Sequence, residues 1–469
     1  MGRSDYGDRT RGSLINRMDV KLINTLERTG NLSPRRLTQR LCFLVALLWT
    51  TSIHAAETAT PAPVVVSEQQ ALKLFYERNL DLITAHYDLE RGEAEQIIAA
   101  ALPNPSVDTE FYMLNEMSYT KQVSPAVNKV WPQGYMSAWS IRIEQLIITA
   151  GKRALRMESS ALGTEALGYD LRDLVRILSN ALRHAYYNLL LTQKNVELFQ
   201  HNLDRYHEIL HINKTRLDIG DIAETDFTRI EVEALKSQAD LNSALATLKQ
   251  AQTELLLLMG WPENALDIRA AEQWPDFNID ISRKSLSELT GLALENRPDL
   301  AAARIRLTQA EKNNELARRM VIPDVTLIGF YLKDPSNFYT STGGVGVSFD
   351  LPVFYRQEGE IAKAGVDANS SRLTIRQTEQ EIRADVLKAQ AAWVTKEEIR
   401  QRFEKSSIPR IEALRKGAEL AYQKGDTGLL ELLDAERNYK VMMQDYYHAL
   451  ADRSNAWADL IMATGVDLH

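Results

Sequence analysis

The sequence lacks the features that mark several classes of protein. Its 469 residues include one cysteine, Cys42, and only 22 glycines and 14 prolines. One cysteine excludes a disulfide framework and a cysteine-rich metal cluster, and the low glycine and proline content excludes a fibrous or low-complexity chain. The net charge of −8 disfavours nucleic acid as a partner, because proteins that bind a duplex normally present a basic surface.

Motifs of catalysis and metal binding are also missing. The sequence contains no phosphate-binding glycine loop, nucleophile elbow or paired zinc motif. His207 and His211 stand four residues apart and Asp204 precedes the first by three, so the three side chains can share one helix face as metal ligands do. Because they flank an apolar packing stripe, we interpret them as residues of a wet helix face. We expect no enzyme, no bound metal and no other cofactor.

Residues 1–56 have the pattern of a secretory signal. Arginines precede the apolar run of residues 41–49, and small residues follow it. The run is too short to span a bilayer. We predict cleavage after Ala55 or Ala56, and Met18 is an alternative start because the charged leader is long. The segment carries 9 basic and 4 acidic residues, so removing its +5 from −8 leaves −13 on the mature chain. The other interpretation is an uncleaved N-terminal anchor.

The rest of the sequence contains one pattern twice. The segment ERNLDL at residues 77–82 matches ENRPDL at residues 295–300 with a shift of 218. Pro105 matches Pro323 with the same shift. Two copies of this size indicate a duplicated domain, because solenoid repeats are much shorter.

The shift becomes smaller further along the chain. Glu144 matches Asp350 at 206, and Gly220 matches Gly425 at 205, so the first copy holds 218 − 206 = 12 extra residues before Glu144. Length differences gather in loops, and a polar stretch with prolines lies there. The predicted order is a signal peptide (1–56), a first repeat (57–260), a connecting segment (261–284) and a second repeat (285–469).

Each copy is predicted to begin with a capped helix. Ser67 with Gln70, and Ser285 with Glu288, have the spacing of a capping box, in which the hydroxyl and the N3 side chain satisfy free amides at a helix start. The two boxes therefore predict where the helical part of each copy starts.

Long helices are predicted further along each copy. From Phe227, apolar and small residues recur at spacings of three and four, and the second copy repeats this heptad seam. The preceding element, residues 152–217, would measure about 100 Å at about 1.5 Å per residue. Helices of that length need other helices beside them, which predicts an extended helical array.

The strand pattern is short and different in kind. Trp139, Ile141 and Ile143 alternate with polar residues, and we predict two β-hairpins, at residues 106–147 and 324–352. Such alternation is the weak signature of a transmembrane β-barrel, but four strands cannot close one, and open edges are not viable in lipid. Three chains sharing one barrel would supply 12 strands. The alternative is two hairpins packed on soluble helices.

Several segments resemble the outer-membrane efflux proteins of the TolC type. The most specific is residues 425–435 (GDTGLLELLDA), which look like the family's second helical turn, and residues 220–226 (GDIAETD) look like the first. Residues 348–360 and 144–156 look like the CzcC-like branch, which works with heavy-metal cation pumps. The resemblance covers nearly all of the mature chain.

The resemblance implies a mainly α fold with a small β part. Long antiparallel helices would form a periplasmic α-barrel, and four strands per chain would join a 12-stranded trimeric β-barrel in the cell outer membrane. The homotrimer would be the exit duct of a tripartite efflux system for divalent heavy-metal cations. Its partners would be a periplasmic adaptor (membrane fusion) protein, an inner-membrane RND-type cation transporter and outer-membrane lipid.

Two rival functions stay open at this point. A duct of the same family for drugs or other organic compounds would have the same fold. A periplasmic coiled-coil adaptor or scaffold belongs to a different class, but the connecting segment is too short to supply the all-β modules that an adaptor needs.

The resemblance also assigns candidate aperture residues. By position after the motif glycine, Glu431 and Asp434 match the family's two acidic aperture residues. Threefold symmetry would turn them into six carboxylates around a narrow axis, where negative potential concentrates cations. The plainer interpretation is that both lie on a solvated helix face.

Other positions match the closed end of the family's tunnel. Asp226 and Tyr422 match a pair that latches neighbouring helices shut, and Gly220 and Gly425 match the helical turns at the periplasmic tip. At the family's basic latch position this sequence has Thr427, so one charged link is missing. The resemblance therefore implies a latch that is weaker or built otherwise.

Overall fold

The computed structural model describes residues 64–114, 136–261, 267–271, 274, 277, 284–333 and 341–466. These residues belong to one compact unit, Pro63–His469. The predicted signal peptide and most of the predicted loop between the first two long strands lie outside the described residues. Among the helices that the structure describes, none has both the length and the apolar character needed to cross a membrane.

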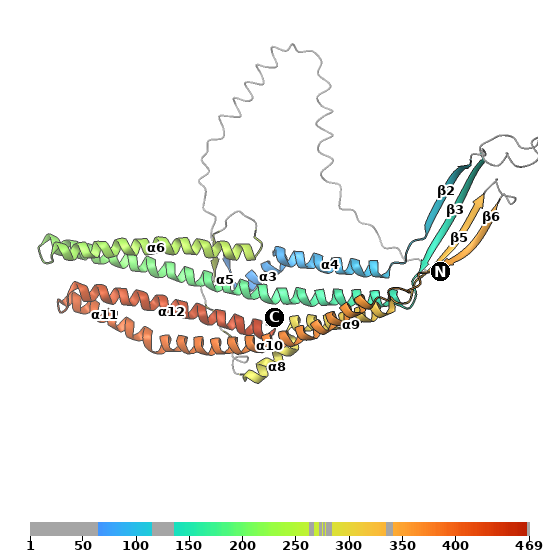
Figure 1. The fold of residues 1–469 in the computed structure, drawn as a ribbon. Helices are drawn as coiled ribbons and strands as arrows, with labels where there is room; N and C mark the ends of the chain where they lie inside the picture. Colours follow the sequence, from blue (N-terminus) through green and yellow to red (C-terminus); the bar gives the residue numbers. More distant parts are fainter. Residues whose placement is uncertain are drawn as a thin grey trace, which may run out of the picture. The chain divides into compact units, whose positions relative to one another are not determined.

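Helices dominate both halves of the unit, and each half carries a β-hairpin (Figure 1). The mainly α fold with a small β part is thereby confirmed, whereas the trimer involves several chains and stays a prediction. The first half contains β1 (Val64–Val66), α3 (Glu68–Arg78), α4 (Leu80–Ala100), β2 (Ser106–Leu114), β3 (Met136–Ile147), α5 (Lys152–Asp218) and α6 (Glu224–Leu258). The second half contains β4 (Ile268–Ala270), α8 (Leu286–Asn296), α9 (Pro298–Arg319), β5 (Val325–Lys333), β6 (Thr342–Ser348), α10 (Glu358–Arg402), the π-helix η1 (Phe403–Ser407), α11 (Ile408–Lys424) and α12 (Leu429–Thr464).

Both predicted capping boxes are confirmed. The Gln70 amide donates to Ser67 Oγ at 3.2 Å, and the Ser67 amide donates back to Gln70 Oε1 at 2.9 Å. The second box, at the start of α8, has the same two bonds. The sequence pattern did not predict that the helix after each box is interrupted. The first break is at Asn79, whose Oδ1 accepts hydrogen bonds from two backbone amides of α4. The second break comes just before Pro298.

The long helices pack side by side along their predicted seam. α5 is a single helix of 67 residues that contacts α4, α6, α9 and α12. On α6 the seam residues Ile230, Ala234, Leu241 and Leu255 are all buried. The spacing of three and four therefore marks the faces that exclude water, as the heptad pattern predicted.

The counterpart of α5 in the second half is interrupted. α10, η1 and α11 hold 45, 5 and 17 residues, which together equal the 67 of α5. Pro409, in the first turn of α11, has no amide to donate, and its ring collides with the carbonyl four residues earlier. A wider π turn relieves that collision, and α10 and α11 meet at a bend in Figure 1.

The two predicted hairpins are both present and join into one sheet. The antiparallel strand order is β2, β3, β5, β6. The central pair joins the halves, with Ile143 of β3 opposite Gly329 of β5. Within this chain β2 and β6 are the two edges, and each has one row of backbone groups that no strand of the described residues pairs.

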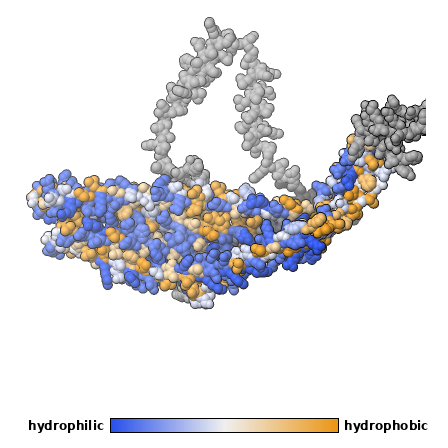
Figure 2. All heavy atoms as spheres, viewed as in Figure 1, coloured by the Kyte–Doolittle hydropathy of each residue, from blue (hydrophilic) through white to orange (hydrophobic). Residues whose placement is uncertain are grey.

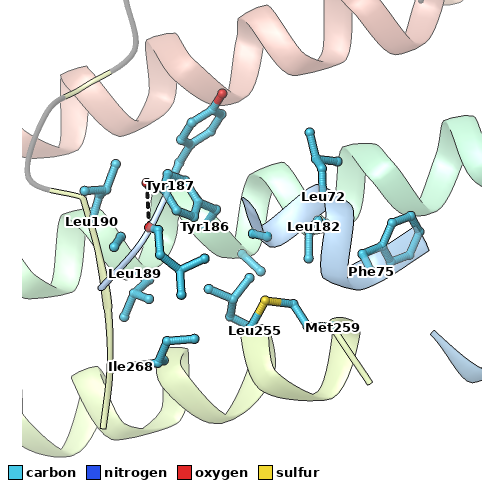
Figure 3. Packing of buried hydrophobic residues seen from close by; sticks show 14 of the residues in the cluster. Leu72, Phe75, Leu182, Tyr186, Tyr187, Leu189, Leu190, Leu255, Met259 and Ile268 are labelled. Carbon is cyan, nitrogen blue, oxygen red and sulfur yellow. Dashed lines mark hydrogen bonds between the residues drawn. The ribbon is translucent and has the colours of Figure 1, made fainter. Parts of the chain in front are cut away.

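A second sheet was not predicted from the sequence. β1 pairs in parallel with β4 of the connecting segment, so Val64 lies opposite Ile268. Side chains from α3, α5, α6 and β4 meet beside it in a buried cluster (Figure 3). The Tyr186 hydroxyl donates to the Val66 carbonyl at 3.3 Å, and burial raises the pKa of Tyr186 to about 12. The N-terminal strand is thus tied to the long helices.

The strands and helices meet at a buried ion pair. Lys152, the first residue of α5, has a side-chain exposure of 2%, and its Nζ lies 2.8 Å from Asp324 Oδ1 just before β5. The Thr149 amide donates to the same carboxylate at 2.8 Å, and the Thr149 hydroxyl donates to the Pro323 carbonyl at 2.7 Å. These bonds join the start of a first-half helix to the start of a second-half strand.

Candidate functional site

Both long helical hairpins turn at a glycine with positive φ. Gly220 follows α5 with φ 78°, and Gly425 follows α11 with φ 79°. The amide of the residue after each glycine donates back into the helix, at 2.8 Å and 2.9 Å. This is the Schellman motif, which favours a residue without Cβ. The two turns lie at the same end of the helices in Figure 1. Their position at a periplasmic tip stays a prediction.

The two candidate aperture carboxylates lie at the start of α12. Glu431 is exposed, and Asp434, three residues later, shares its helix face. Asp434 forms an ion pair with Arg437 at 3.3 Å, and Arg437 also reaches Glu233 of α6 at 3.1 Å. No ion pair involves Glu431 within the described ranges. The negative charge of Asp434 is therefore partly balanced inside the chain, and that of Glu431 is not.

Tyr422 lies at a contact between the two hairpins. Its hydroxyl donates to Asn213 Oδ1 of α5, and the Arg216 guanidinium lies 5.2 Å from the centre of its ring. Arg216 also pairs with Asp221 at 2.7 Å, and this bond raises the pKa of Arg216 above its ordinary value. A permanent cation therefore reaches Tyr422 from the other hairpin, although the sequence has Thr427 where the family has a basic residue.

The predicted latch partner of Tyr422 lies elsewhere in this chain. Asp226, in the first turn of α6, is 3.5 Å from Arg229. Among the described residues, no hydrogen bond or ion pair joins Asp226 to Tyr422. The predicted latch of Asp226 and Tyr422 between neighbouring helices stays a prediction. The Thr427 hydroxyl is buried and has no hydrogen-bond partner in the part of the chain that the structure describes.

A buried ionic cluster close to this end was missed by sequence reasoning. Glu436 of α12 has a side-chain exposure of 2%, and its Oε1 lies 3.1 Å from Arg205 Nε on α5. Arg205 also pairs with Glu208 and with Glu419 of α11, and Arg415 of α11 lies 3.9 Å from Glu436. Burial alone would lower the pKa of Arg205, but its three carboxylate partners outweigh burial and raise it. The second hairpin is thereby tied to α5.

The histidines of the discounted metal pattern lie on an exposed face. His207 and His211 both point to solvent on α5, and Asp204 accepts a hydrogen bond from Gln200 at 2.9 Å. Among the described residues, no group of three or more His, Cys, Asp or Glu side chains is arranged to hold a metal ion. Near their turns, the described parts of these helices therefore act on a ligand or ion through the electrostatic field of their charged side chains.

Comparison with protein families agrees with this geometry. A family model described as "Outer membrane efflux protein" matches residues 71–261 and 289–466. Each matched span runs from the first helix of one half to the end of its last helix, so the family's pattern occurs twice in the chain.

Curated relatives are similar over most of their length. Nodulation protein T of Rhizobium leguminosarum bv. trifolii is 24% identical over 412 residues, which are 83% of this chain and 83% of the relative. Pyoverdine export outer membrane protein OpmQ of Pseudomonas putida is 24% identical over 387 residues, which are 79% of each chain.

Solved structures share the fold. The outer-membrane channel OprN has a TM-score of 0.70 and 21% identity, covering 85% of this chain and 89% of that one. The CmeC outer membrane channel of Campylobacter jejuni has a TM-score of 0.72 and 19% identity, covering 85% of both chains. These similarities support the fold alone, because sequence identities this low do not indicate a shared substrate.

Proposed function

The chain belongs to the outer membrane efflux protein family, and on that premise we propose that it is the exit duct for divalent heavy-metal cations. Family channels are outer-membrane trimers with a large periplasmic helical part, and they work with an adaptor and an inner-membrane transporter. The channel and its location follow from the family. The metal cargo, and an RND-type cation transporter as the partner, are the proposal.

The exposed carboxylate of Glu431 is the observation that carries this proposal. It stands near the Gly425 turn and one helical turn from Asp434. Around a threefold axis these residues would supply six carboxylates, and a narrow ring of one charge sign concentrates the opposite ion. Since Arg437 already balances Asp434, Glu431 would supply most of the attraction.

Ion selectivity tests the aperture directly. Glu431→Gln and Asp434→Asn remove charge and keep shape. In planar bilayers with a salt gradient, we expect the reversal potential to show a weaker cation preference for both variants, with the larger loss for Glu431→Gln. Glu254→Gln, at an exposed position near the far end of α6, is the matched control. Equal selectivity in all three variants would contradict the aperture assignment.

The latch is proposed to combine contacts within and between chains. Tyr422 is held by Asn213 and Arg216 of its own chain, and Asp226 is proposed to meet a neighbouring chain. Tyr422→Phe removes the hydroxyl and keeps the ring over Arg216, so we expect a modest rise in single-channel conductance. Asp226→Asn should raise conductance as well if it closes the latch. No change for Asp226→Asn would restrict the latch to the contacts within one chain.

Metal tolerance tests the cargo. Deletion of the gene should lower tolerance to at least one of zinc, cobalt, cadmium, nickel or copper, and the wild-type gene should restore it. The alternative cargo is an organic compound, because one relative is named for pyoverdine export. Unchanged tolerance to all five metals, together with retention of an organic substrate in the cell, would favour that alternative and leave the channel itself in place.

A further inference from the structure

We propose that a cleft between α5, α6 and α12 binds a small zwitterion, of the size of an amino acid or a short peptide, through the ion pair of Lys440 and Asp240. The cleft is built from helices of both halves. None of the residues that line it belongs to the candidate aperture or latch. Such a site is independent of the cargo that the channel carries.

The cleft is large enough for a small organic molecule. Its volume is about 410 Å³. Pockets for small molecules measure about 300–1,000 Å³, whereas one water molecule takes up about 30 Å³. α5 contacts both α6 and α12 and lies between them in Figure 1. Each helix lines the cleft with polar residues three or four positions apart: Thr192 and Asn195, Ser243 and Thr247, and Lys440 and Gln444.

An ion pair in the wall of the cleft joins α12 to α6. The Lys440 ammonium donates to Asp240 Oδ2 at 2.7 Å, and the two side chains are 15% and 35% exposed. The same ammonium lies 5.9 Å from the centre of the Phe199 ring. An ammonium has three protons and a carboxylate has two oxygens, so both groups keep hydrogen-bonding capacity beyond this one bond. Partial burial also reduces the screening of their charges by salt.

A side-chain amide without a partner lies in the same cleft. The Oδ1 atom of Asn195 is buried, and no group of the described residues donates a hydrogen bond to it. Buried polar atoms in native structures are nearly always satisfied by protein, water or a ligand. Asn195 therefore marks a place where the cleft needs a hydrogen-bond donor from outside the chain.

These groups are complementary to a molecule that carries both charges. A ligand carboxylate can accept from Lys440, and a ligand ammonium can donate to the second oxygen of Asp240 and to Asn195. An anion alone would be repelled by Asp240, and a cation alone would be repelled by Lys440. In a zwitterion each charge lies beside its opposite, so all four charges attract their neighbours.

The rest of the lining can hold the carbon skeleton of such a ligand. Leu191, Ala244 and the ring of Phe199 line the cleft together with the polar groups. Ligand sites commonly combine apolar walls, which hold the skeleton, with a few polar groups that fix its orientation. The lining therefore fits a small organic zwitterion better than a bare inorganic ion.

The surroundings of the cleft favour a ligand dissolved in water. Figure 2 shows hydrophilic residues over much of the long helices, whereas hydrophobic residues gather along the strands. Ser243 and Thr247 are exposed, so α6 contributes an open, polar side to the cleft. A polar opening of this kind admits a small soluble molecule and disfavours a lipid tail.

The duplication does not repeat the chemistry of this cleft. At the shift of 206, the apolar lining residues Leu191 and Phe199 correspond to Glu397 and Lys405. Glu397 is engaged by Arg453 at 2.7 Å. The second half thus has charged residues at the positions where the first half lines a space, so the site is specific to the α5 side.

Calorimetric titration of the whole protein in detergent tests the site. The probes are glycine, L-alanyl-L-alanine and L-alanyl-L-alanyl-L-alanine, three zwitterions of increasing length. We expect at least one of them to bind with a Kd below about 1 mM. The same compound with an acetylated amino group and an amidated carboxyl group has no charge, and it should bind at least tenfold more weakly. Failure of all three zwitterions to bind would overturn the site and leave a cleft that holds water only. Equal binding of the capped compound would overturn recognition through the two charges.

A pair of lysine variants tests the role of the ion pair. Lys440→Met removes the ammonium and keeps the length of the side chain, so we expect the Kd to rise about tenfold, as for the loss of one charged hydrogen bond. Lys312→Met is the matched control, because Lys312 pairs with Glu158 at 2.8 Å outside the cleft. The control should keep the wild-type Kd. Equal affinities of the two variants would overturn the role assigned to Lys440.

A second pair of variants leaves the ion pair intact, in case Lys440→Met fails to fold. Thr247 and Ala246 are both exposed on α6, but only Thr247 lines the cleft. Thr247→Trp should fill the opening and abolish binding, whereas Ala246→Trp should retain it. Both variants should keep the wild-type helical circular dichroism. Unchanged binding in Thr247→Trp would locate the ligand elsewhere and overturn the site.

Discussion

The two halves of this chain share a ground plan and differ in what holds their long helices together. α5 runs through 67 residues without a break, whereas the equally long span of the second half bends at a π-helix next to Pro409. The long helices α5 and α6 of the first half meet through apolar side chains and one buried hydrogen bond, from Ser237 Oγ to Asn202 Oδ1 at 2.9 Å. Between α10 and α12 the second half adds ion pairs, so the interrupted half has charged ties between its long helices.

One pair of matching positions makes this difference concrete. Glu397 of α10 and Arg453 of α12 form an ion pair at 2.7 Å. At the shifts of 206 and 205 they correspond to Leu191 and Leu248 of the first half, which are buried and partly buried. The matching positions thus hold a salt bridge in one copy and two leucines in the other. The duplicated positions are kept, whereas the chemical character of their side chains differs.

The largest expected effect separates two glutamates at matching positions. Glu436→Ala removes the buried partner of Arg205, which keeps Glu208 and Glu419. Losing one member of a buried pair costs about 3–5 kcal/mol of unfolding free energy, and we expect the lower end of that range. The counterpart Glu231 is exposed, so Glu231→Ala should change stability by less than about 0.5 kcal/mol. Denaturant unfolding of the detergent-solubilised protein, followed by helical circular dichroism, measures both. Similar losses would remove the contrast between the halves.

A second experiment transfers the interruption to the continuous helix. Asp204 is exposed on α5, close to the position that matches Pro409. Asp204→Pro should destabilise the protein by about 3 kcal/mol, because it removes a hydrogen bond and collides with the preceding turn. Pro409→Ala should cost less than about 1 kcal/mol, since it lets an ordinary helix replace the π turn. Thermal unfolding compares them, and a larger loss for Pro409→Ala would show that the bend itself is required.

The pH dependence of stability should come from the charged half. Burial opposes the negative charge of Glu397, but hydrogen bonds from Arg400, Gln401 and Arg453 lower its pKa from 4.5 to about 2. A lowered carboxyl pKa stabilises the folded state above pH 4.5, and that stabilisation is lost as the pH falls toward 2. Glu397→Gln should therefore cost about 2 kcal/mol at pH 7 and have a flatter stability profile between pH 4.5 and 2.

Copying the first half into the second is the control for that experiment. The double variant Glu397→Leu with Arg453→Leu gives the second half the leucines that the first half has at the matching positions 191 and 248. Replacing a partly buried ion pair with well-packed apolar residues is often neutral or stabilising. We expect this variant to match the wild type at pH 7. A loss as large as that of Glu397→Gln would mean that the ion pair fixes the helices in a way that leucines cannot.

The smallest effect should be equal in both halves. Gly220→Ala and Gly425→Ala place a Cβ on a backbone with positive φ, at a cost of about 1 kcal/mol each. Neither added Cβ would meet another atom within 4 Å, so the cost is conformational. A clear difference in melting temperature between the two variants would indicate that one turn carries a contact that the other lacks.

Local patterns predicted most of the fold. The capping boxes at Ser67 and Ser285, the seam from Phe227 and both hairpins were readable because each depends on residues a few positions apart. The helix breaks at Asn79 and Pro298 were less visible, since the apolar spacing continues through them. The pairing of β1 with β4 was missed because three-residue strands are too short for a period to appear.

The candidate site was less predictable for a different reason. Glu431, Asp434 and the two glycines were located by their place in a short motif. The ties of Arg205 to Glu436, and of Arg216 to Tyr422, join residues about 200 positions apart across packed helices. Which of many exposed-looking arginines meets which glutamate depends on how the helices are rotated and staggered, and a linear pattern does not carry that information.

The pairing of β1 with β4 also has a consequence for the order of folding. A chain exported from its N-terminus delivers Val64 to the periplasm early and Ile268 only after both long helices of the first half have passed. Until then the hydroxyl of Tyr186 and the apolar faces around Phe75 lack their strand cover. Such a non-local contact forms slowly, because a long stretch of chain must become ordered before the contact contributes stabilising free energy. The first half is thus synthesised first but completed late, and chaperones of the periplasm would meet it in that unfinished state.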